Sequence, residues 1–397
     1  MFITIVIIIT LIRDRDSKPN VQEQIITPWE VEGATIDGKT QAIDYNKLIE
    51  KFGTRHVDEE LLKRFESLTG RKCHVFLRRG FFFSHREFTR ILDRFEQKKP
   101  FYLYTGRGPK IYDKINSFRW LQEVFDIPIV IQLTDDEKFL FKPDLSLEKA
   151  RQFSYDNAKD IIACGFKLEK TLIFSNLDYV GALLLVNPRP PLVSMTGELH
   201  YSMYIIDRIL STIFANIPFR LSDCIGKLHF VAVQATPSFS NSFPQIFGTR
   251  SDIPCLIPCA IDQDPYFRLT RDVAHKLKYP KPCLIHAKFF PALQGPQTKM
   301  SASVDNSAIF MSDTPNQIKK KINKFAFSGG GDTLELHKLH GGNPDVDVAY
   351  QYLAVFLDDD VELADIYKKY KSGEMMTGEL KERCIKVLQK FVGDFQQ

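Results

Sequence analysis

The sequence lacks a long hydrophobic run. The apolar stretch at its N-terminus, Met1–Ile12, is shorter than the roughly 20 residues that a membrane-spanning helix needs. No basic segment precedes this stretch and no small-residue cleavage site follows it, so a secretory signal is not indicated. We therefore expect no membrane anchor, and we interpret Met1–Ile12 as a segment without a function of its own.

The number of cysteines and the net charge are also low. The chain has seven cysteines, an odd number scattered mostly through apolar segments, which argues against a disulfide framework and indicates the reduced thiols of an intracellular protein. An alternative for Cys255 and Cys259 is half of a zinc site, but no second Cys or His pair has matching spacing, so core positions are favoured. The net charge of +4 permits a polyanionic partner without requiring one.

Short apolar runs alternate with helical stretches along the middle of the 397-residue chain. This pattern predicts an α/β fold, with a Rossmann-like doubly wound parallel sheet. The predicted strands are Phe101–Tyr104, Ile127–Leu133, Lys170–Ser175, Leu228–Val233, Cys255–Ile261 and Cys283–Phe289. Ligands of open α/β sheets bind beyond the carboxyl ends of the strands. We therefore expect functional groups in the loops Gly106–Pro109, Gln132–Glu137 and Asn176–Tyr179.

The pattern divides the chain into three parts. Residues 1–43 are expected to form a loose N-terminal arm, residues 44–312 a nucleotide-binding domain, and residues 313–397 an α-helical domain. A proline-rich apolar stretch near residues 182–196 interrupts the middle part and is expected to be an inserted loop. The last part begins with Thr314 as the predicted N-cap of a lysine-rich helix, whose charges indicate a solvated face or a nucleic-acid contact.

The region from Asp44 to Lys98 has a helical pattern. Within it, Ser84 is a predicted N-cap for the helix that follows. Its neighbour His85 is expected to have a structural role, because a lone histidine beside an aromatic run is more often structural than catalytic.

A short polar segment follows the last predicted strand: Lys299-Met300-Ser301-Ala302-Ser303. The lysine ammonium can lie over a polyphosphate while Ser301, Ser303 and nearby backbone N–H groups bond its oxygens. Alone, five such residues are weak evidence for nucleotide chemistry. The argument depends on the stretches upstream over which this segment would close.

The segment resembles the Lys-Met-Ser-Lys-Ser loop of class I aminoacyl-tRNA synthetases. Together with the upstream stretches, the sequence resembles the tryptophanyl-tRNA synthetases of the eukaryotic cytosolic branch, from Pro28 to about Leu388. Tyrosyl enzymes share the fold and the lysine loop, but the stretches at residues 234–247 and 260–267 favour the tryptophan branch. The resemblance implies a cytosolic ligase that activates L-tryptophan with Mg-ATP, transfers it from the adenylate to tRNA(Trp), and forms a homodimer.

The resemblance also implies roles for individual residues. Tryptophan would be bound by Tyr104, Gln132, Glu137, Gln234, Gln263 and Phe267. ATP would be bound by Gly106, Arg107, Gly108, Pro109, Ala260, Asp262, Lys299, Met300 and Ser301, with Lys299, Ser301 and Ser303 as the catalytic residues. Asp332 would contact tRNA, and no protein metal site is expected. This set fits the chemistry, because an indole N–H needs an acceptor and an α-ammonium needs a carboxylate.

Three departures separate the sequence from this family. The His-x-Gly-His signature of class I synthetases is missing after Pro109, and no histidine occurs between His85 and His200. The insertion near residues 182–196 and an early C-terminus are the other two, and Gly331 stands where the family usually has arginine. These departures are typical of splice-site errors in a predicted gene. They favour, as the alternative function, a catalytically impaired homologue that binds tryptophan or tRNA without aminoacylation.

Overall fold

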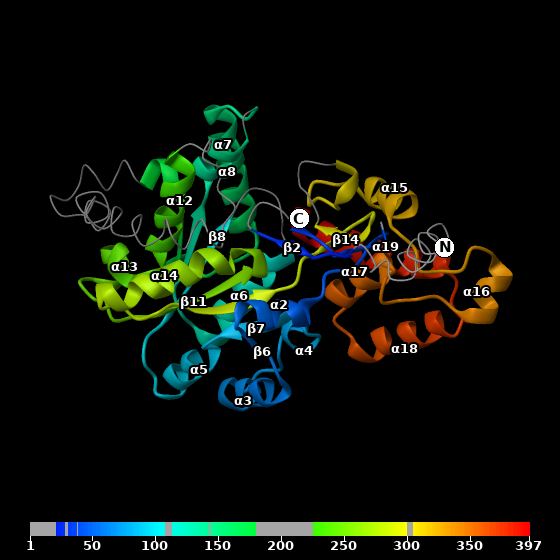
Figure 1. The fold of residues 1–397 in the computed structure, drawn as a ribbon, viewed down its shortest axis with the longest axis horizontal. Helices are drawn as coiled ribbons and strands as arrows, with labels where there is room; N and C mark the ends of the chain where they lie inside the picture. Colours follow the sequence, from blue (N-terminus) through cyan, green and yellow to red (C-terminus); the bar gives the residue numbers. More distant parts are fainter. Residues whose placement is uncertain are drawn as a thin grey trace, which may run out of the picture.

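The protein consists of an α/β half, built on a central sheet, and a C-terminal half of helices (Figure 1). The structure, a computed structural model, describes residues 21–27, 31–37, 39–107, 113–142, 144–179, 225–299 and 305–397. The stretches Met1–Ile12 and 182–196 therefore lie outside the described residues. Among the described residues, no helix combines the length and apolarity that crossing a bilayer requires.

The central sheet has seven strands in the order β10-β9-β8-β11-β12-β7-β6. Their bounds are β6 (Arg55–His56), β7 (Phe82–Arg86), β8 (Tyr102–Arg107), β9 (Ile129–Leu133), β10 (Thr171–Ser175), β11 (Cys255–Ala260) and β12 (Cys283–Ala287). Strands β8 to β12 pair in parallel, whereas β7 and β6 are antiparallel additions at one edge. The predicted parallel sheet is confirmed, with an antiparallel edge that the sequence pattern did not indicate.

Helices cover both faces of this sheet. They are α2 (Tyr45–Phe52), α3 (Glu59–Thr69), α4 (Val75–Arg78), α5 (Phe88–Glu96), α6 (Asp113–Phe125), α7 (Asp135–Phe141), α8 (Leu147–Ala163), α12 (Ile225–Ala235), α13 (Pro244–Phe247) and α14 (Asp264–Leu277). Because strand side chains alternate in direction, Leu103 and Ile131 pack on one face in a core with residues of α3, α5, α6 and α8. Tyr104 and Ile257 point to the other face, where they pack with Phe267 of α14.

Two predicted elements are wrong. Leu228–Val233 lies in helix α12 rather than in a strand, because an apolar run of six residues does not distinguish a buried helix from a buried strand. Phe82–Arg86 is strand β7 inside the region predicted to be helical. Ser84 is therefore a buried strand residue, not an N-cap, and its hydroxyl lies 3.0 Å from Nδ1 of His286.

His85 has the structural role that was predicted. Its Nδ1 accepts a hydrogen bond from the backbone N–H of Phe88, at 3.1 Å, at the start of α5. The ring is 3% exposed, and burial lowers the pKa of His85 to about 4. His85 is therefore neutral at physiological pH and anchors a turn.

The described part of the N-terminal arm pairs with the strand that ends at Lys299. Strands β13 (Pro291–Ala292) and β14 (Gly295–Lys299) form a hairpin, which β3 (Val31–Glu32) and β2 (Ile25–Ile26) extend to four strands. Thr298 pairs with Glu32, so the predicted arm does form a short strand. A second small sheet consists of β1 (Val21–Gln22), β4 (Thr35–Ile36) and β5 (Lys39–Thr40).

The C-terminal half is helical, as predicted. It comprises α15 (Pro315–Phe325), α16 (Leu334–His340), α17 (Val348–Phe356), α18 (Asp360–Lys371) and α19 (Thr377–Gln396). Thr314 caps α15 and forms a capping box with Gln317, which confirms the predicted start of this helix. The core of this half also includes Phe290 and Leu293 of the β13–β14 region, and the ring of Phe290 lies 4.7 Å from that of Tyr352.

Two arginines join the halves. Arg78 and Arg79, at the end of α4, both bond the carboxylate of Asp360, at 2.8 Å from Arg78 Nε and 2.7 Å from one terminal nitrogen of Arg79. Arg79 also donates to the backbone carbonyl of Leu357, at 2.6 Å, beyond the end of α17. Arg79 thus places a cation near the C-terminus of α17, where it complements the helix dipole. Both arginines also make charge-assisted hydrogen bonds to Asp360, so the dipole and the ion pairs both favour this contact between the halves.

Candidate active site

The topological switch point of the sheet lies between β8 and β11. From β8 the chain proceeds outward through β9 and β10, and it then returns to place β11 and β12 on the other side of β8. The connections after β8 and β11 therefore leave in opposite directions, and the carboxyl ends of two such strands are where open α/β sheets bind their ligands. Tyr104 and Gly106 belong to β8, and Gln263 follows β11 directly, so predicted site residues from both sides lie at this point.

The centre of the candidate site is a buried contact between Tyr104 and Gln132. The Tyr104 hydroxyl lies 2.6 Å from Oε1 of Gln132 and 2.8 Å from the backbone carbonyl of Gln234. Tyr104 is 0% and Gln132 1% exposed. A phenol has a single proton, so it satisfies only one of these acceptors at a time, and an acceptor lone pair remains for a third group.

Gln234 and Gln263 form the second polar pair of the site. Nε2 of Gln234 donates to Oε1 of Gln263, at 3.1 Å. Oε1 of Gln234 is buried and has no hydrogen-bond partner among the described residues. Leaving a buried acceptor unpaired costs about 1–3 kcal/mol, a cost that a ligand donor would remove. Gln234 comes from the last turn of α12, so the prediction that all the polar groups follow strands is wrong for this residue.

Phe267 and Glu137 complete the predicted tryptophan set. The ring of Phe267 lies edge-on to Tyr104, with 6.1 Å between centroids. Glu137 belongs to the first turn of α7, where the Thr134 hydroxyl donates to its Oε2, at 2.9 Å, and Lys138 Nζ lies 3.1 Å from the same atom. The carboxylate is thus held at a helix N-terminus, where negative charge is favoured.

On the predicted ATP side, the structure describes fewer residues. A Cβ at Gly106 would lie 3.5 Å from Oε1 of Gln132 and 3.7 Å from the Tyr104 hydroxyl, so glycine leaves space beside these atoms. Ala260 ends β11, and Asp262 is buried in the 3-10 turn before α14. Arg107 and Lys299 end β8 and β14, respectively. The predicted residues Gly108, Pro109, Met300, Ser301 and Ser303 lie outside the described residues.

Asp332, predicted to contact tRNA, lies far along the chain in the helical half. It is exposed in the loop before α16, and the neighbouring loop is held by a hydrogen bond from the N–H of Gly331 to Nδ1 of His337, at 3.2 Å. A Cβ at Gly331 would lie 2.8 Å from the backbone nitrogen of His337, closer than real Cβ contacts. This loop conformation therefore requires glycine at 331, where the family usually has arginine.

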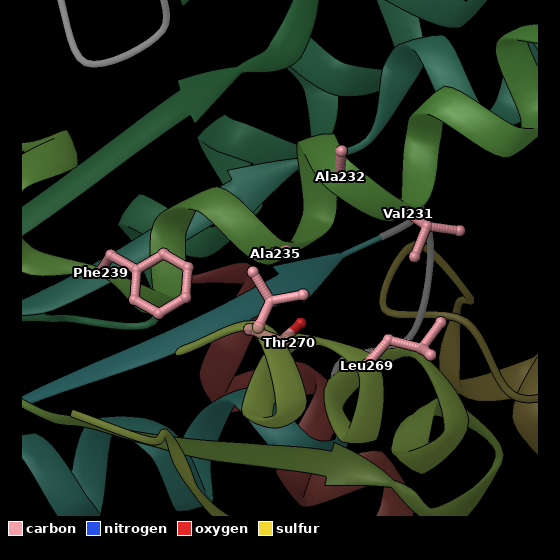
Figure 2. Close-up of a pocket in the computed structure, with 7 residues that line it drawn as sticks. Val231, Ala232, Ala235, Phe239, Leu269 and Thr270 are labelled. Carbon is pink, nitrogen blue, oxygen red and sulfur yellow. The ribbon is translucent and has the colours of Figure 1, made fainter. Parts of the chain in front are cut away.

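A small cavity lies between α12 and α14 (Figure 2). Only apolar surface lines its volume of about 20 Å³, contributed by Val231, Ala232, Ala235, Phe239, Leu269, Thr270 and Val273. A cavity of this size has room for about one water molecule. It is therefore a packing defect and not a substrate site.

Comparison with known proteins identifies the family. Residues 249–393 match the family model described as tRNA synthetases class I (W and Y). Over 390 residues, the chain is 58% identical to the cytoplasmic tryptophan–tRNA ligase of Schizosaccharomyces pombe, covering 95% of this chain and 94% of that protein. The chain belongs to the tryptophanyl-tRNA synthetases. It is also 52% identical to the human cytoplasmic enzyme, over 94% of this chain and 78% of that protein.

Solved synthetase structures have the same fold. The tryptophanyl-tRNA synthetase of Giardia lamblia superposes with a TM-score of 0.79 at 38% identity, covering 89% of this chain and 92% of that one. The Encephalitozoon cuniculi enzyme, bound to tryptophan, gives a TM-score of 0.74 at 36% identity, covering 89% and 95%. These similarities confirm the predicted fold class and family.

In this synthetase two residues of the site were not predicted, Asn176 and Asp136. Nε2 of Gln132 donates to Oδ1 of Asn176, at 2.8 Å, and Nδ2 of Asn176 donates to Oδ1 of Asp136, at 2.7 Å. Both residues fall in loops that were expected to carry function, at the ends of β9 and β10. Their position was therefore indicated by the sequence, whereas their contact was not.

Burial has a measurable consequence at Asp136. It raises the pKa of Asp136 to about 6, since burial outweighs the hydrogen bonds from Asn176 and the Glu137 N–H. A raised carboxyl pKa means that the folded state binds the proton more tightly than the unfolded chain. The free energy of unfolding therefore falls as the pH rises from about 4 to about 6, by up to about 3 kcal/mol.

We expect Asp136→Asn to remove this pH dependence. The amide keeps an oxygen for Asn176 and for the Glu137 N–H but carries no charge, so the variant should be more stable than the wild type at pH 7.5, and the difference should vanish near pH 4. Urea unfolding at pH 4, 6 and 7.5 measures this, with Asp144→Asn as an exposed control. Parallel pH profiles for wild type and Asp136→Asn would contradict the assignment.

Proposed function

We propose that this protein is a tryptophan–tRNA ligase of the cytoplasm, which forms tryptophanyl-adenylate from L-tryptophan and Mg-ATP and transfers the tryptophanyl group to tRNA(Trp). The observation that carries the proposal is the buried contact of Tyr104 with Gln132 at the switch point of the sheet, beside the unpaired amide oxygen of Gln234. These groups supply acceptors for an indole N–H and an ammonium.

The residues of the site divide into two tasks. Tyr104 and Gln132 accept the indole N–H, Phe267 packs beside the ring, and Glu137 holds the α-ammonium. Gly106 lies at the carboxyl end of β8, where the absence of a side chain would let a ligand approach the backbone. The activation step mainly requires that tryptophan and ATP are held in position and that positive charge lies opposite the leaving pyrophosphate.

In the activation step, a carboxylate oxygen of tryptophan forms a bond to the α-phosphorus, and the bond from that phosphorus to the β-phosphate oxygen breaks. Pyrophosphate leaves with the bonding electrons. Lys299, at the end of β14, supplies the positive charge that this leaving group requires. In the transfer step a hydroxyl at the 3′ end of tRNA attacks the acyl carbon, and AMP leaves.

Magnesium fits this site only as Mg-ATP. Among the described residues, no cluster of three or more His, Cys, Asp or Glu side chains is arranged to hold a metal. The nearby acids are already engaged, since Asp135 accepts from Ser175 and Asp136 accepts from Asn176. Magnesium would therefore be bound by phosphate oxygens and water, and it would neutralise charge on the phosphates.

The tRNA contact is proposed on the helical half, through exposed Asp332 and the lysines of α15. A homodimer is proposed as well, with a mass in solution of twice the 45.7 kDa of the chain. Light scattering on the purified protein measures that mass directly.

Tryptophan-dependent ATP–pyrophosphate exchange on the purified protein tests the proposal, with Lys299→Ala as the disabled control. Exchange that requires tryptophan and is lost in the control would support the ligase, although the His-x-Gly-His signature is missing. A folded protein that binds tryptophan but shows no exchange would instead be the catalytically impaired homologue. The identity of 58% to a named ligase favours the first outcome.

A further inference from the structure

A chain of side-chain hydrogen bonds leads away from Tyr104, one of the residues proposed to bind tryptophan. It consists of Asp136, Asn176, Gln132 and Tyr104, joined by contacts of 2.7, 2.8 and 2.6 Å. Asn176 is 2% and Gln132 1% exposed, so water does not compete for these bonds. The four residues come from four separate places in the fold: Tyr104 from β8, Gln132 from β9, Asp136 from the first turn of α7, and Asn176 directly after β10.

The direction of this chain is set at Asp136. Its Oδ1 accepts from the Glu137 backbone N–H, at 2.8 Å, and therefore presents an acceptor to Asn176. Asn176 must turn its NH₂ toward Asp136 and its oxygen toward Gln132. Gln132 in turn directs its NH₂ to Asn176, at 2.8 Å, and more weakly to the backbone carbonyl of Val233, at 3.3 Å, and it directs its oxygen to Tyr104. The two ends of an amide have almost the same shape, so partners of this kind are what fixes its orientation.

The orientation of Gln132 matters for the indole. With Oε1 forward, Gln132 and the Tyr104 hydroxyl together offer lone pairs to a ring N–H. With the amide reversed, its NH₂ would face that N–H, and donor would oppose donor. If the Gln132 amide could turn freely, the pocket would accept a ring with or without an N–H donor and would discriminate poorly between the two.

We propose that Asn176 and Asp136 are positioning residues that hold the Gln132 carbonyl oxygen toward the pocket, and so make the site selective for an amino acid whose ring carries an N–H donor. The inference rests on the proposed function, because it requires that the pocket takes tryptophan. It adds two residues, neither of which touches the substrate, to those that determine specificity.

Asn176→Leu tests the proposal, since leucine has a similar size but neither bonds Asp136 nor orients Gln132. Asn176→Ser is a milder variant whose short hydroxyl cannot span both partners. The measurement is the ratio of dissociation constants for L-tryptophan and for its benzothiophene analogue, in which sulfur replaces the ring N–H. The wild type should prefer tryptophan by about tenfold or more, and both variants should lose most of that preference.

Two controls separate orientation from general damage. Gln122→Leu removes another fully buried amide, which donates to Thr171 Oγ1 at 3.0 Å outside the pocket, and it should keep the wild-type ratio. Asp136→Asn keeps the acceptor oxygen and should also keep the ratio, whereas Asp136→Leu should lose it. This rescue by the conservative variant would not be expected of a merely structural role.

Because binding is measured without catalysis, failure of the inference and failure of the proposed function are distinguishable. If the wild type prefers tryptophan and Asn176→Leu and Asn176→Ser, both folded, keep the same ratio, the positioning role is overturned and the function stands. If Gln122→Leu loses the ratio as well, the role is likewise overturned. If the wild type binds no tryptophan, the proposed function fails, and the inference fails with it.

Discussion

Replacing Arg86 with methionine should lower the free energy of unfolding by about 3–5 kcal/mol. The Arg86 guanidinium bonds both oxygens of Asp264, from Nε at 2.6 Å and from one terminal nitrogen at 2.7 Å. Asp264 is 0% exposed at the start of α14, and its other basic neighbours are more distant, with Nε2 of His286 at 3.1 Å and Nε of Arg268 at 3.5 Å. Methionine fills similar space but leaves a buried charge without its main partner. Urea unfolding and thermal melting at pH 7.5 measure the loss.

The pH dependence of this loss has a definite sign. Burial alone would raise the pKa of Asp264, but hydrogen bonds from Arg86 and His286 outweigh it and hold that pKa well below its usual range. The pair therefore contributes stability above pH 4, and the contribution disappears as the pH falls below the usual range of a carboxyl. The difference between wild type and Arg86→Met should shrink accordingly in acid.

Arg250→Met is the matched control for Arg86→Met. Arg250 also makes a two-pronged contact with an aspartate, Asp252, at 2.9 and 2.7 Å, but both side chains are about half exposed or more. Its loss should leave the free energy of unfolding nearly unchanged, because solvent screens an exposed ion pair. Replacing Asp264 with leucine in the Arg86→Met background should recover part of the loss, because no buried charge then remains. Equal melting temperatures for Arg86→Met and Arg250→Met would refute the argument.

Lys299→Ala should slow tryptophan-dependent pyrophosphate exchange by about 10²–10³-fold, the usual cost of losing one group that stabilises charge in a transition state. Lys299 ends β14, where its backbone is held by pairing with Pro291, and the neighbouring Thr298 pairs with Glu32 of β3. The backbone at this position therefore belongs to the four-stranded sheet. Because negative charge on the bridging oxygen grows as pyrophosphate leaves, kcat should fall more than the KM for ATP rises.

Lys320→Ala removes the same charge from an exposed position of α15 and serves as the control. It should leave exchange unchanged, since exchange requires no tRNA. A Lys299→Ala protein that keeps exchange within about threefold of wild type would show that another group neutralises the pyrophosphate. The role assigned to Lys299 would then be wrong.

Much of the sheet was predictable because its strands are short, apolar and bounded by polar turns. The predicted strand Ile127–Leu133 contains β9, and the predicted strand Cys283–Phe289 contains β12. The start of α15 at Pro315 was predictable from its cap, since Thr314 and Pro315 act within one turn. The wrong prediction of a strand at Leu228–Val233 has a physical cause. Whether an apolar run such as Leu228–Val233 becomes helix or strand depends on what packs around it.

The site was predictable only in part, for a related reason. Tyr104 and Gln132 were predicted from the family resemblance, and the structure brings them into contact. The bond between Asn176 and Asp136 joins residues 40 positions apart, and that between Arg86 and Asp264 joins residues 178 apart. Pairs at such separations depend on strand order, which a single sequence does not provide.

The placement of Phe290 and Leu293 limits how the protein can be dissected. Both side chains are buried in the core of the helical half, together with Ile318 and Tyr352, although they precede Lys299 in the chain. A recombinant fragment ending at residue 312 would expose them, and a fragment beginning at 313 would lack part of its own interior. Neither piece should fold autonomously, so the strand that ends at Lys299 can be studied only in a protein that retains the C-terminal helices.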